Sequence, residues 1–294
     1  MIIVAIYRSD RTGRAFGLEG TCNNHYDANR FYDRLTIRPH RASTTLPATA
    51  ECRSMDPVYR DRAVFVDGTL VVADLHFGKG AASNVEFPLG ASEECVDRLR
   101  DLLAHFEPDE VVLAGDVFHS FDYVPDATER ALADLTGAVR DAGARPVLLE
   151  GNHDAMLDSV WDGDLHREYE ITGENGSEDA AESESVVVCH GHEEPETPAD
   201  RYVVGHDHPM VVIEGQKRPC FLDGRGVYRG ADVLVVPLFN RLIEGVSVNG
   251  RIGVARPELS PLVTNVAEFR PVVWDDDAEQ SLEFPPLGQF ERML

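Results

Sequence analysis

The feature that most constrains this chain is a pattern that occurs five times: a short apolar run ends in Asp, Asn or His, with glycine in most cases close by. Such runs are typical of buried strands, and the carboxyl ends of strands border the ligand crevice of an α/β sheet. Glycine lets the backbone turn sharply there. We therefore expect these polar side chains to meet at one sheet edge. The five clusters are Asp74-Leu75-His76, Gly115-Asp116, Gly151-Asn152-His153-Asp154, His190-Gly191-His192 and Gly205-His206-Asp207-His208.

The segments around these clusters alternate between strand and helix patterns. Residues 63–66 and 69–74 are apolar and are joined by Asp67-Gly68, a favourable hairpin turn. Residues 91–106 and 126–142 carry apolar side chains at helical spacing. The order of strands and helices predicts an α/β fold with a sheet covered by helices. Further apolar strands are expected at 110–116, 145–154, 185–192 and 201–208.

The residue types in the clusters fit two divalent cations. Carboxylate, imidazole and amide groups without a thiolate suit Mn²⁺, Fe²⁺ or Mg²⁺, and also Zn²⁺. In extended backbone, side chains at i and i+2 point the same way, so Asp74 and His76 could reach one metal, as could His206 and His208. A bridging carboxylate, for which Asp116 is the best candidate, would hold two metals about 3.5–4 Å apart.

Each cluster alone is weak evidence. An Asp-x-His pair arises often by chance, and Gly-Asn-His-Asp also forms an ordinary turn or helix cap. The ordered set of all five, spread from Asp74 to His208, is far less expected by chance.

This ordered set resembles the calcineurin-like metallophosphoesterase family over roughly residues 60–240. More narrowly, the sequences DLHFGKG, GDVFHS, GNHD, GHDHP, RPCF and VVPLFN are similar to the SbcD-related and DNA-ligase-associated phosphoesterase branch. The resemblance implies an α/β fold in which two sheets form a sandwich flanked by helices. It also implies hydrolysis of phosphate esters by a metal-bridging hydroxide.

The resemblance assigns roles to individual residues. His153 corresponds to the family's catalytic histidine, which is not a ligand and stabilises charge or protonates the leaving oxygen. His119 follows the nuclease form of the motif, GDxFH, although a surface loop histidine is the alternative. His192 and Lys79 are weaker candidates for contact with substrate phosphate. The implied metal ligands are Asp74, His76 and His208 for one ion, Asn152, His190 and His206 for the other, and Asp116 between them.

The net charge of −25 is unusual, and the only lysines are Lys79 and Lys217. We interpret this as adaptation to a salt-rich cytoplasm, where a Debye length of roughly 3 Å at about 1 M salt screens self-repulsion. The melting temperature should therefore rise between about 0.1 M and about 3 M KCl, and an ordinary acidic protein would not show this. In dilute salt this charge disfavours the binding of nucleic acid, but in molar salt the repulsion is largely screened.

Three regions are expected along the chain. Residues 1–54 hold 8 Arg against 5 acidic residues, a net of +3, and we expect a poorly ordered extension outside the domain, with a genuine basic arm as the alternative. Residues 55–260 would form the metallophosphoesterase domain, with a mobile acidic loop at 173–185. Residues 261–294 are expected to be a tail with limited packing.

The leading hypothesis is a two-metal phosphodiesterase, with nucleic acid as one candidate substrate and Mn²⁺ as the favoured metal. The alternatives are a phosphomonoesterase or cyclic-nucleotide hydrolase with the same centre, and a non-catalytic scaffold. Little sequence after about residue 250 remains for a separate DNA-capping domain, which argues against break processing with an ATPase partner. Five scattered cysteines and the lack of a long apolar run indicate a reducing, cytoplasmic location without membrane insertion. The oligomeric state is not predicted.

Overall fold

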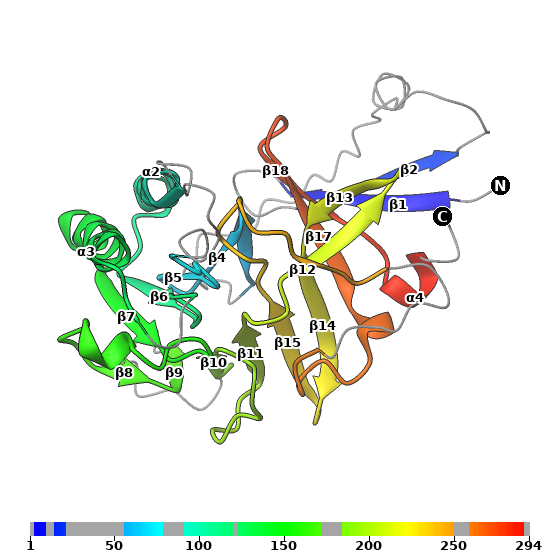
Figure 1. Ribbon diagram of the computed structural model, residues 1–294. Coiled ribbons are helices and arrows are strands. Elements are labelled where there is room, and N and C mark those ends of the chain that lie inside the picture. Colours follow the sequence, from blue (N-terminus) through cyan, green and yellow to red (C-terminus); the bar gives the residue numbers. More distant parts are fainter. Residues whose placement is uncertain are drawn as a thin grey trace, which may run out of the picture.

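The computed structural model describes residues 56–78, 91–119, 123–171, 184–249 and 259–290, and the backbone of two strands at 3–9 and 15–21. Within these residues the chain forms two large sheets, a small third sheet and two long helices (Figure 1). The fold is α/β, as the sequence predicted, and the two large sheets face each other as expected.

The first large sheet has six strands in the order β3-β4-β5-β6-β7-β8. The hairpin around Asp67-Gly68 is confirmed: β4 and β5 are antiparallel, and both turn residues have positive φ. From β5 to β8 the strands are parallel. The strands are β3 (Val58–Arg60), β4 (Ala63–Val66), β5 (Thr69–Val72), β6 (Glu110–Leu113), β7 (Arg145–Leu149) and β8 (Leu165–His166).

The second large sheet has nine strands in the order β2-β1-β18-β17-β14-β15-β11-β10-β9. Only β10, β11 and β15 are mutually parallel, and the other described pairs are antiparallel. The strands are β1 (Ile3–Ser9), β2 (Ala15–Thr21), β9 (Glu168–Ile171), β10 (Val186–Cys189), β11 (Arg201–Val204), β14 (Phe221–Tyr228), β15 (Ala231–Val235), β17 (Arg270–Asp275) and β18 (Gln280–Glu283).

Three apolar layers hold the fold together. Helices α2 (Ala91–Phe106) and α3 (Asp126–Asp141) cover the outer face of the first sheet, as Figure 1 shows beside β5 to β7. The inner faces of the two sheets pack against each other through aliphatic side chains such as Val71, Val188 and Leu234. Central strands such as β5, β10 and β11 are buried at every position, because successive side chains of a strand enter opposite layers and both layers are apolar.

The outer face of the second sheet is covered differently. A small sheet in the order β13-β12-β16 packs there with the segment around Leu262 and Phe269. The elements are β12 (Pro209–Ile213), β13 (Gln216–Pro219), β16 (Val246–Ser247), the short helix α4 (Leu287–Phe290), and two 3-10 turns, η1 (Leu157–Ser159) near β7 and η3 (Val266–Glu268). The expected flanking by helices is therefore unequal, because both long helices lie on the first sheet.

Segments from both ends of the chain form strands of the second sheet. Strands β17 and β18 lie inside the second sheet, and Val272 and Val273 are buried. Strand β1 pairs with β2 and with β18, at Tyr7 and Glu283 among other positions. The domain boundaries themselves stay predictions.

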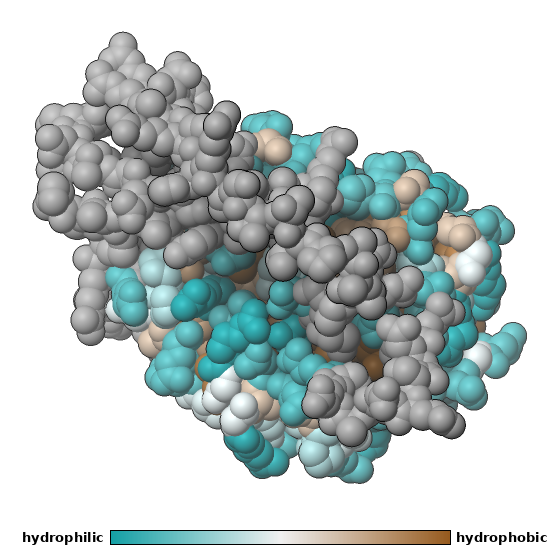
Figure 2. Space-filling view, turned by 180° about the vertical axis from the view of Figure 1, so that it is seen from behind, coloured by the Kyte–Doolittle hydropathy of each residue, from teal (hydrophilic) through white to brown (hydrophobic). Residues whose placement is uncertain are grey.

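Some expectations fall outside the described residues. These are Lys79, most of the acidic loop (172–183), and residues 22–55 of the proposed extension. Among the described helices, none has the length and apolarity needed to cross a bilayer. On the face shown in Figure 2 the described residues are mostly hydrophilic, and apolar patches are small.

Candidate metal centre

The polar clusters lie in the turns that follow the strands, and their backbone is not extended. Asp74 and His76 have φ of 57° and 42°, and His206 and His208 have φ of 67° and 46°. We expected each pair to converge through the alternation of extended backbone, and the structure shows another arrangement. The pairs converge because both members adopt the left-handed conformation, which is costly for residues with a Cβ and is concentrated at functional sites.

Main-chain hydrogen bonds to the neighbouring strand's turn fix the segment around Asp74 and His76. Asp74 N donates to Gly115 O at 3.1 Å, and His76 N donates to Asp116 O at 2.8 Å. These bonds continue the parallel pairing of β5 and β6 beyond the strand ends. The two clusters are therefore one structural unit, and both carboxylates are buried, with Asp74 at 0% and Asp116 at 2% exposure.

A first donor group forms around the Oδ2 atom of Asp116. His76 Nε2 lies 3.6 Å from this oxygen and 3.2 Å from His208 Nε2. His208 Nε2 also lies 3.2 Å from Asp74 Oδ1. One donor atom from each of the four residues lies within 4.8 Å of all the others, so these side chains could hold one ion.

A second donor group adjoins the other oxygen of Asp116. His190 Nε2 lies 3.4 Å from Asp116 Oδ1 and 3.1 Å from Asn152 Oδ1. The ring centroid of His206 lies 5.1 Å from that of His190. The backbone N–H of His206 donates to the Asp74 carboxylate at 3.1 Å, which ties the second group to the first. The structure thus brings together all seven expected ligands.

The carboxylates and imidazoles of the centre shift one another's pKa values. Burial raises the pKa of Asp116, but the hydrogen bond and charge of His190 outweigh it, so this pKa lies well below its usual value. Burial also opposes a charge on His190, yet its contacts with Asp116 and Asp74 raise the pKa of His190 to about 9. Burial lowers the pKa of His76 and of His206 to about 4. Burial opposes a charge on His208 as well, but the charge and hydrogen bond of Asp74 raise its pKa. The carboxylates therefore attract positive charge, and His76 and His206 are the imidazoles that burial keeps neutral.

The residues fit divalent cations. In the first group the Nε2 atoms of two imidazoles face each other beside two buried carboxylates, and a cation between them would stabilise this arrangement. His76 Nδ1 is buried without a hydrogen-bond partner, so its Nε2 is the atom that faces the centre. Carboxylate, imidazole and amide donors together suit Mn²⁺, Fe²⁺ or Zn²⁺.

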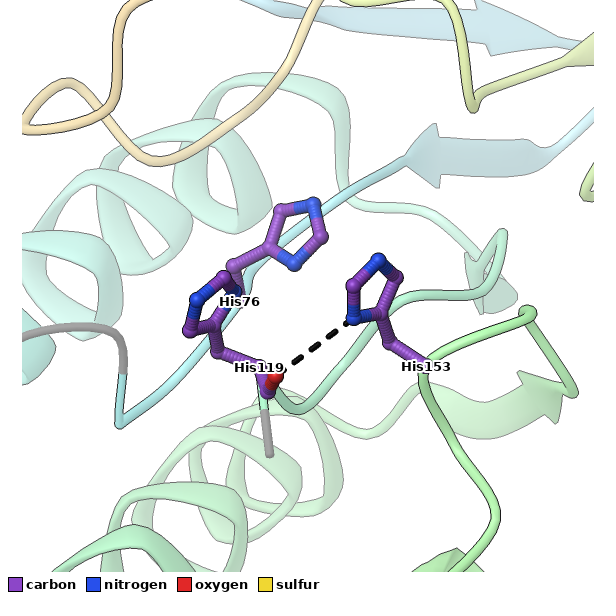
Figure 3. A group of neighbouring side chains, drawn as sticks. All are labelled: His76, His119 and His153. Carbon is purple, nitrogen blue, oxygen red and sulfur yellow. Dashed lines mark hydrogen bonds between the residues drawn. The ribbon is translucent and has the colours of Figure 1, made fainter. Parts of the chain in front are cut away.

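His153 and His119 lie beside the first group (Figure 3). His153 Nδ1 lies 3.4 Å from the carbonyl oxygen of His119, and the two rings are stacked with centroids 5.6 Å apart. His153 Nε2 then faces Asp116 Oδ2 at 4.0 Å. His119 therefore lies at the centre, and the surface alternative does not describe its position. His192 packs against His190, with ring centroids 5.2 Å apart, and is half-buried.

Three buried residues outside the expected ligand set support the centre. Asp154 accepts hydrogen bonds from the backbone N–H groups of Gly151, Val117 and Phe118. Asp207 accepts one from Ser260 N, and its other oxygen is buried without a partner. Asn240 binds the Leu75 carbonyl. Each lies inside a motif quoted above, GNHD, GHDHP or VVPLFN, and that was the only available signal.

A cavity of about 570 Å³ opens next to the second donor group. It is lined by Asn152, His190 and His192 on one side. Its lining also includes the acidic residues Glu150, Asp158 and Glu193 and the basic residue Arg167.

Solved structures with similar architecture include two phosphate-ester enzymes. The Pseudomonas putida nuclease MPE is 21% identical, with a TM-score of 0.45, and the match covers 74% of this chain and 96% of that one. The E. coli phosphoesterase Yfce is 17% identical, with a TM-score of 0.35, and the match covers 71% and 88%. No curated protein matches the sequence. The family model for calcineurin-like phosphoesterases matches residues 69–232, more than half of the chain. The chain therefore belongs to the calcineurin-like phosphoesterase family and is a hydrolase of phosphate esters.

Proposed function

We propose that this protein hydrolyses phosphodiester bonds with two divalent metal ions, and that nucleic acid is its leading candidate substrate. One observation carries the proposal. The two oxygens of Asp116 face different donor groups, Oδ2 towards His76 and Oδ1 towards His190, at 3.6 and 3.4 Å. A carboxylate in this position would bridge two ions. The first ion would be held by Asp74, His76 and His208, and the second by Asn152, His190 and His206.

When bound, two such ions would neutralise the phosphate and lower the pKa of water, which is the chemistry that a charged diester requires. The protein supplies the remaining steps. The His119 carbonyl accepts a hydrogen bond from His153 Nδ1, which leaves Nε2 facing the centre. As an imidazolium, with a proton on each ring nitrogen, His153 would then donate from Nε2 to the phosphate or protonate the leaving oxygen. Mn²⁺ is the favoured metal because the donors are carboxylate, amide and imidazole.

Support for nucleic acid comes from the sequence GDVFH, in which His119 follows the nuclease form of the motif. The acidic cavity favours a second candidate. Its carboxylates would repel a long polyanion in dilute salt, so a small phosphodiester or a phosphomonoester fits it better there. In molar salt this repulsion is screened over about 3 Å, so it no longer opposes the binding of nucleic acid. We place the protein in a salt-rich cytoplasm; the free cysteines Cys95, Cys189 and Cys220 agree with a reducing compartment.

The test is hydrolysis by Mn²⁺-loaded protein in molar KCl. Single-stranded DNA, double-stranded DNA, RNA, bis-p-nitrophenyl phosphate and p-nitrophenyl phosphate would be compared at matched concentrations. We expect the diesters to turn over faster than the monoester. Faster cleavage of p-nitrophenyl phosphate would favour the monoesterase, and His153→Ala with unchanged turnover on every substrate would contradict the catalytic role of His153.

Metal stoichiometry tests the two-ion centre separately. His208→Gln removes a ligand of the first group, and His190→Gln removes one of the second. Each variant should retain one Mn²⁺ where the wild type retains two, as measured by metal analysis after gel filtration. Wild-type protein that retains a single ion at saturation would contradict the two-metal proposal. His166→Gln is a suitable control, because His166 lies in β8 and contacts the Tyr169 ring.

A further inference from the structure

A segment after β15 runs beside the turn that carries the first donor group. Leu238 forms a parallel bridge with Ala73, and Phe239 N donates to Ala73 O at 2.9 Å. The next residue, Asn240, lies opposite Leu75, between Asp74 and His76. The turn is therefore held on both sides, by the segment around Asp116 on one side and by residues 238–240 on the other.

Beyond Phe239, in the described part of this segment, the turn is bonded by the side chain of Asn240 and not by main-chain groups. Its Nδ2 donates to Leu75 O at 2.9 Å, and its Oδ1 accepts from Leu242 N at 3.0 Å. The residue is 1% exposed, so water cannot replace these bonds. A buried carbonyl that loses its donor costs about 1–3 kcal/mol.

The Leu75 carbonyl belongs to the peptide that joins Leu75 to His76, so its direction is tied to ψ of Leu75 and to φ of His76. Asp74 and His76 have φ of 57° and 42°, a conformation that such residues leave unless the surroundings hold them. Rotation of this peptide would move the His76 ring away from His208 Nε2, which lies 3.2 Å from its own Nε2. The donor from Asn240 opposes that rotation.

Two arginines hold the Asn240 segment in turn. Arg62 Nη1 donates to the carbonyls of Leu238 and Asn240, at 3.0 and 3.2 Å. Arg98 Nη1 donates to Phe239 O at 2.7 Å, and its guanidinium group lies 4.2 Å from the centre of the Phe239 ring. Asn240 is thus anchored to the turn before β4 and to α2, independently of the metal ligands.

We propose that Asn240 is a positioning residue that holds the Asp74–His76 turn in its metal-binding conformation. The inference rests on the proposed metal centre and goes beyond it, because Asn240 offers no atom to the ion. Loss of a partner that orients a ligand typically weakens metal affinity by about 10- to 100-fold. The affinity for the ion at the second donor group should fall less.

The test compares Asn240→Ala and Asn240→Asp with wild type. Aspartate has the shape of asparagine and keeps the acceptor for Leu242 N, but it cannot donate to Leu75 O. Mn²⁺ dissociation constants would be measured by electron paramagnetic resonance, and thermal melts would be recorded with and without Mn²⁺. We expect the Mn²⁺ dissociation constant of the first site to rise by about 10- to 100-fold in both variants. The Mn²⁺-induced rise in Tm should be smaller than in wild type.

Asn249→Ala is the matched control. The Asn249 amide also makes two main-chain hydrogen bonds, with Val212 N at 2.7 Å and Val212 O at 2.9 Å, but it joins β12 and does not contact a ligand. The control should lose a similar amount of metal-free stability and keep wild-type Mn²⁺ affinity. Equal loss of Mn²⁺ affinity in Asn249→Ala and Asn240→Ala would overturn the proposal, as would wild-type affinity in either folded Asn240 variant.

Three further outcomes are informative. If neither Asn240 variant folds, the residue is a structural one and the positioning role is rejected. Excess Mn²⁺ should restore turnover in Asn240→Ala, and failure to restore it in protein shown to be loaded would also reject the role. Wild-type protein without Mn²⁺ binding would reject the metal centre together with this inference, whereas normal binding without hydrolysis would reject only the proposed function.

Discussion

The two large sheets contribute to the centre in different ways. The first sheet supplies both carboxylates, and main-chain bonds between adjacent turns hold them, as with His76 N and Asp116 O at 2.8 Å. The second sheet supplies His190, His206 and His208, and side-chain bonds there add to main-chain bonds such as that from Gly205 N to His190 O at 3.1 Å. Ser260 N donates to Asp207, and the Ser260 hydroxyl donates to Gly191 O.

The difference is one of degree, because β10 and β11 are parallel neighbours as well. Parallel neighbours β5, β6 and β7 end at the same edge, so their turns can continue the ladder. The turn after β11 has fewer main-chain partners among the described residues, and the buried Asp207 and Ser260 replace them. Changes in the first sheet should therefore affect the metal centre most, and changes behind the second sheet should affect mainly stability.

Asp116→Asn should have the largest effect. Asparagine keeps the shape and tolerates the left-handed φ of 50°, but it removes the charge that both donor groups share. We expect loss of both ions and a fall in kcat greater than the roughly 100-fold that loss of an outer partner causes. Metal analysis and steady-state kinetics would measure this. Asp97→Asn, on the exposed face of α2, is the control. Two ions retained in Asp116→Asn would contradict the bridging role.

Gly151→Ala should have the next largest effect. A Cβ at this position would lie 2.2 Å from the Asp116 nitrogen and from its Oδ1 atom, so either the turn or the carboxylate must move. Overpacking of this kind costs about 1–3 kcal/mol, and we expect loss of the second ion.

Gly137→Ala is the matched control for Gly151→Ala. Gly137 lies in α3, and its added Cβ would meet no atom within 4 Å. Alanine in a helix is favoured over glycine by about 0.5–1 kcal/mol, so this variant should be more stable and bind metal normally. Urea unfolding would measure both stabilities. Similar destabilisation by the two substitutions would show that the contact of Gly151 with Asp116 is not the cause.

Ser260→Ala tests the second sheet. The backbone N–H that binds Asp207 remains, while the hydroxyl that donates to Gly191 O is lost. We expect destabilisation of about 1–3 kcal/mol with Mn²⁺ affinity changed less than in Gly151→Ala. A greater loss of affinity than in Gly151→Ala would reverse the proposed ranking of the two sheets.

Asp61→Asn should have the smallest effect on metal binding and a clear effect on acid stability. Burial opposes the charge of Asp61, but Arg98 and Arg241 outweigh it and hold its pKa below the usual value of about 3.9. A lowered folded pKa gives stability that is present above the unfolded pKa and is lost as pH falls through the folded one. Wild type should therefore exceed Asp61→Asn near neutral pH, and the difference should shrink below about pH 4. A constant difference across that range in urea melts would contradict this.

Much of the fold could be predicted from local pattern. The hairpin at Asp67-Gly68 and the helices at 91–106 and 126–141 follow from turn chemistry and periodicity, and the structure confirms them. The place of residues 270–283 could not be predicted, because β17 pairs with β14, some fifty residues earlier, and no local signal encodes that partner. Asn240 was missed for the same reason, since its partner Leu75 is 165 residues away.

The sequence by itself determined which side chains could serve as ligands, because strand ends, glycines and donor types are all local properties. Only the tertiary structure decided how they converge. The left-handed turns at Asp74, His76, His206 and His208 replace the extended backbone that alternation suggested. Such turns persist only where distant residues hold them, and the pairing of β5 with β6, the Asn240 amide and the Asp74 carboxylate do so here.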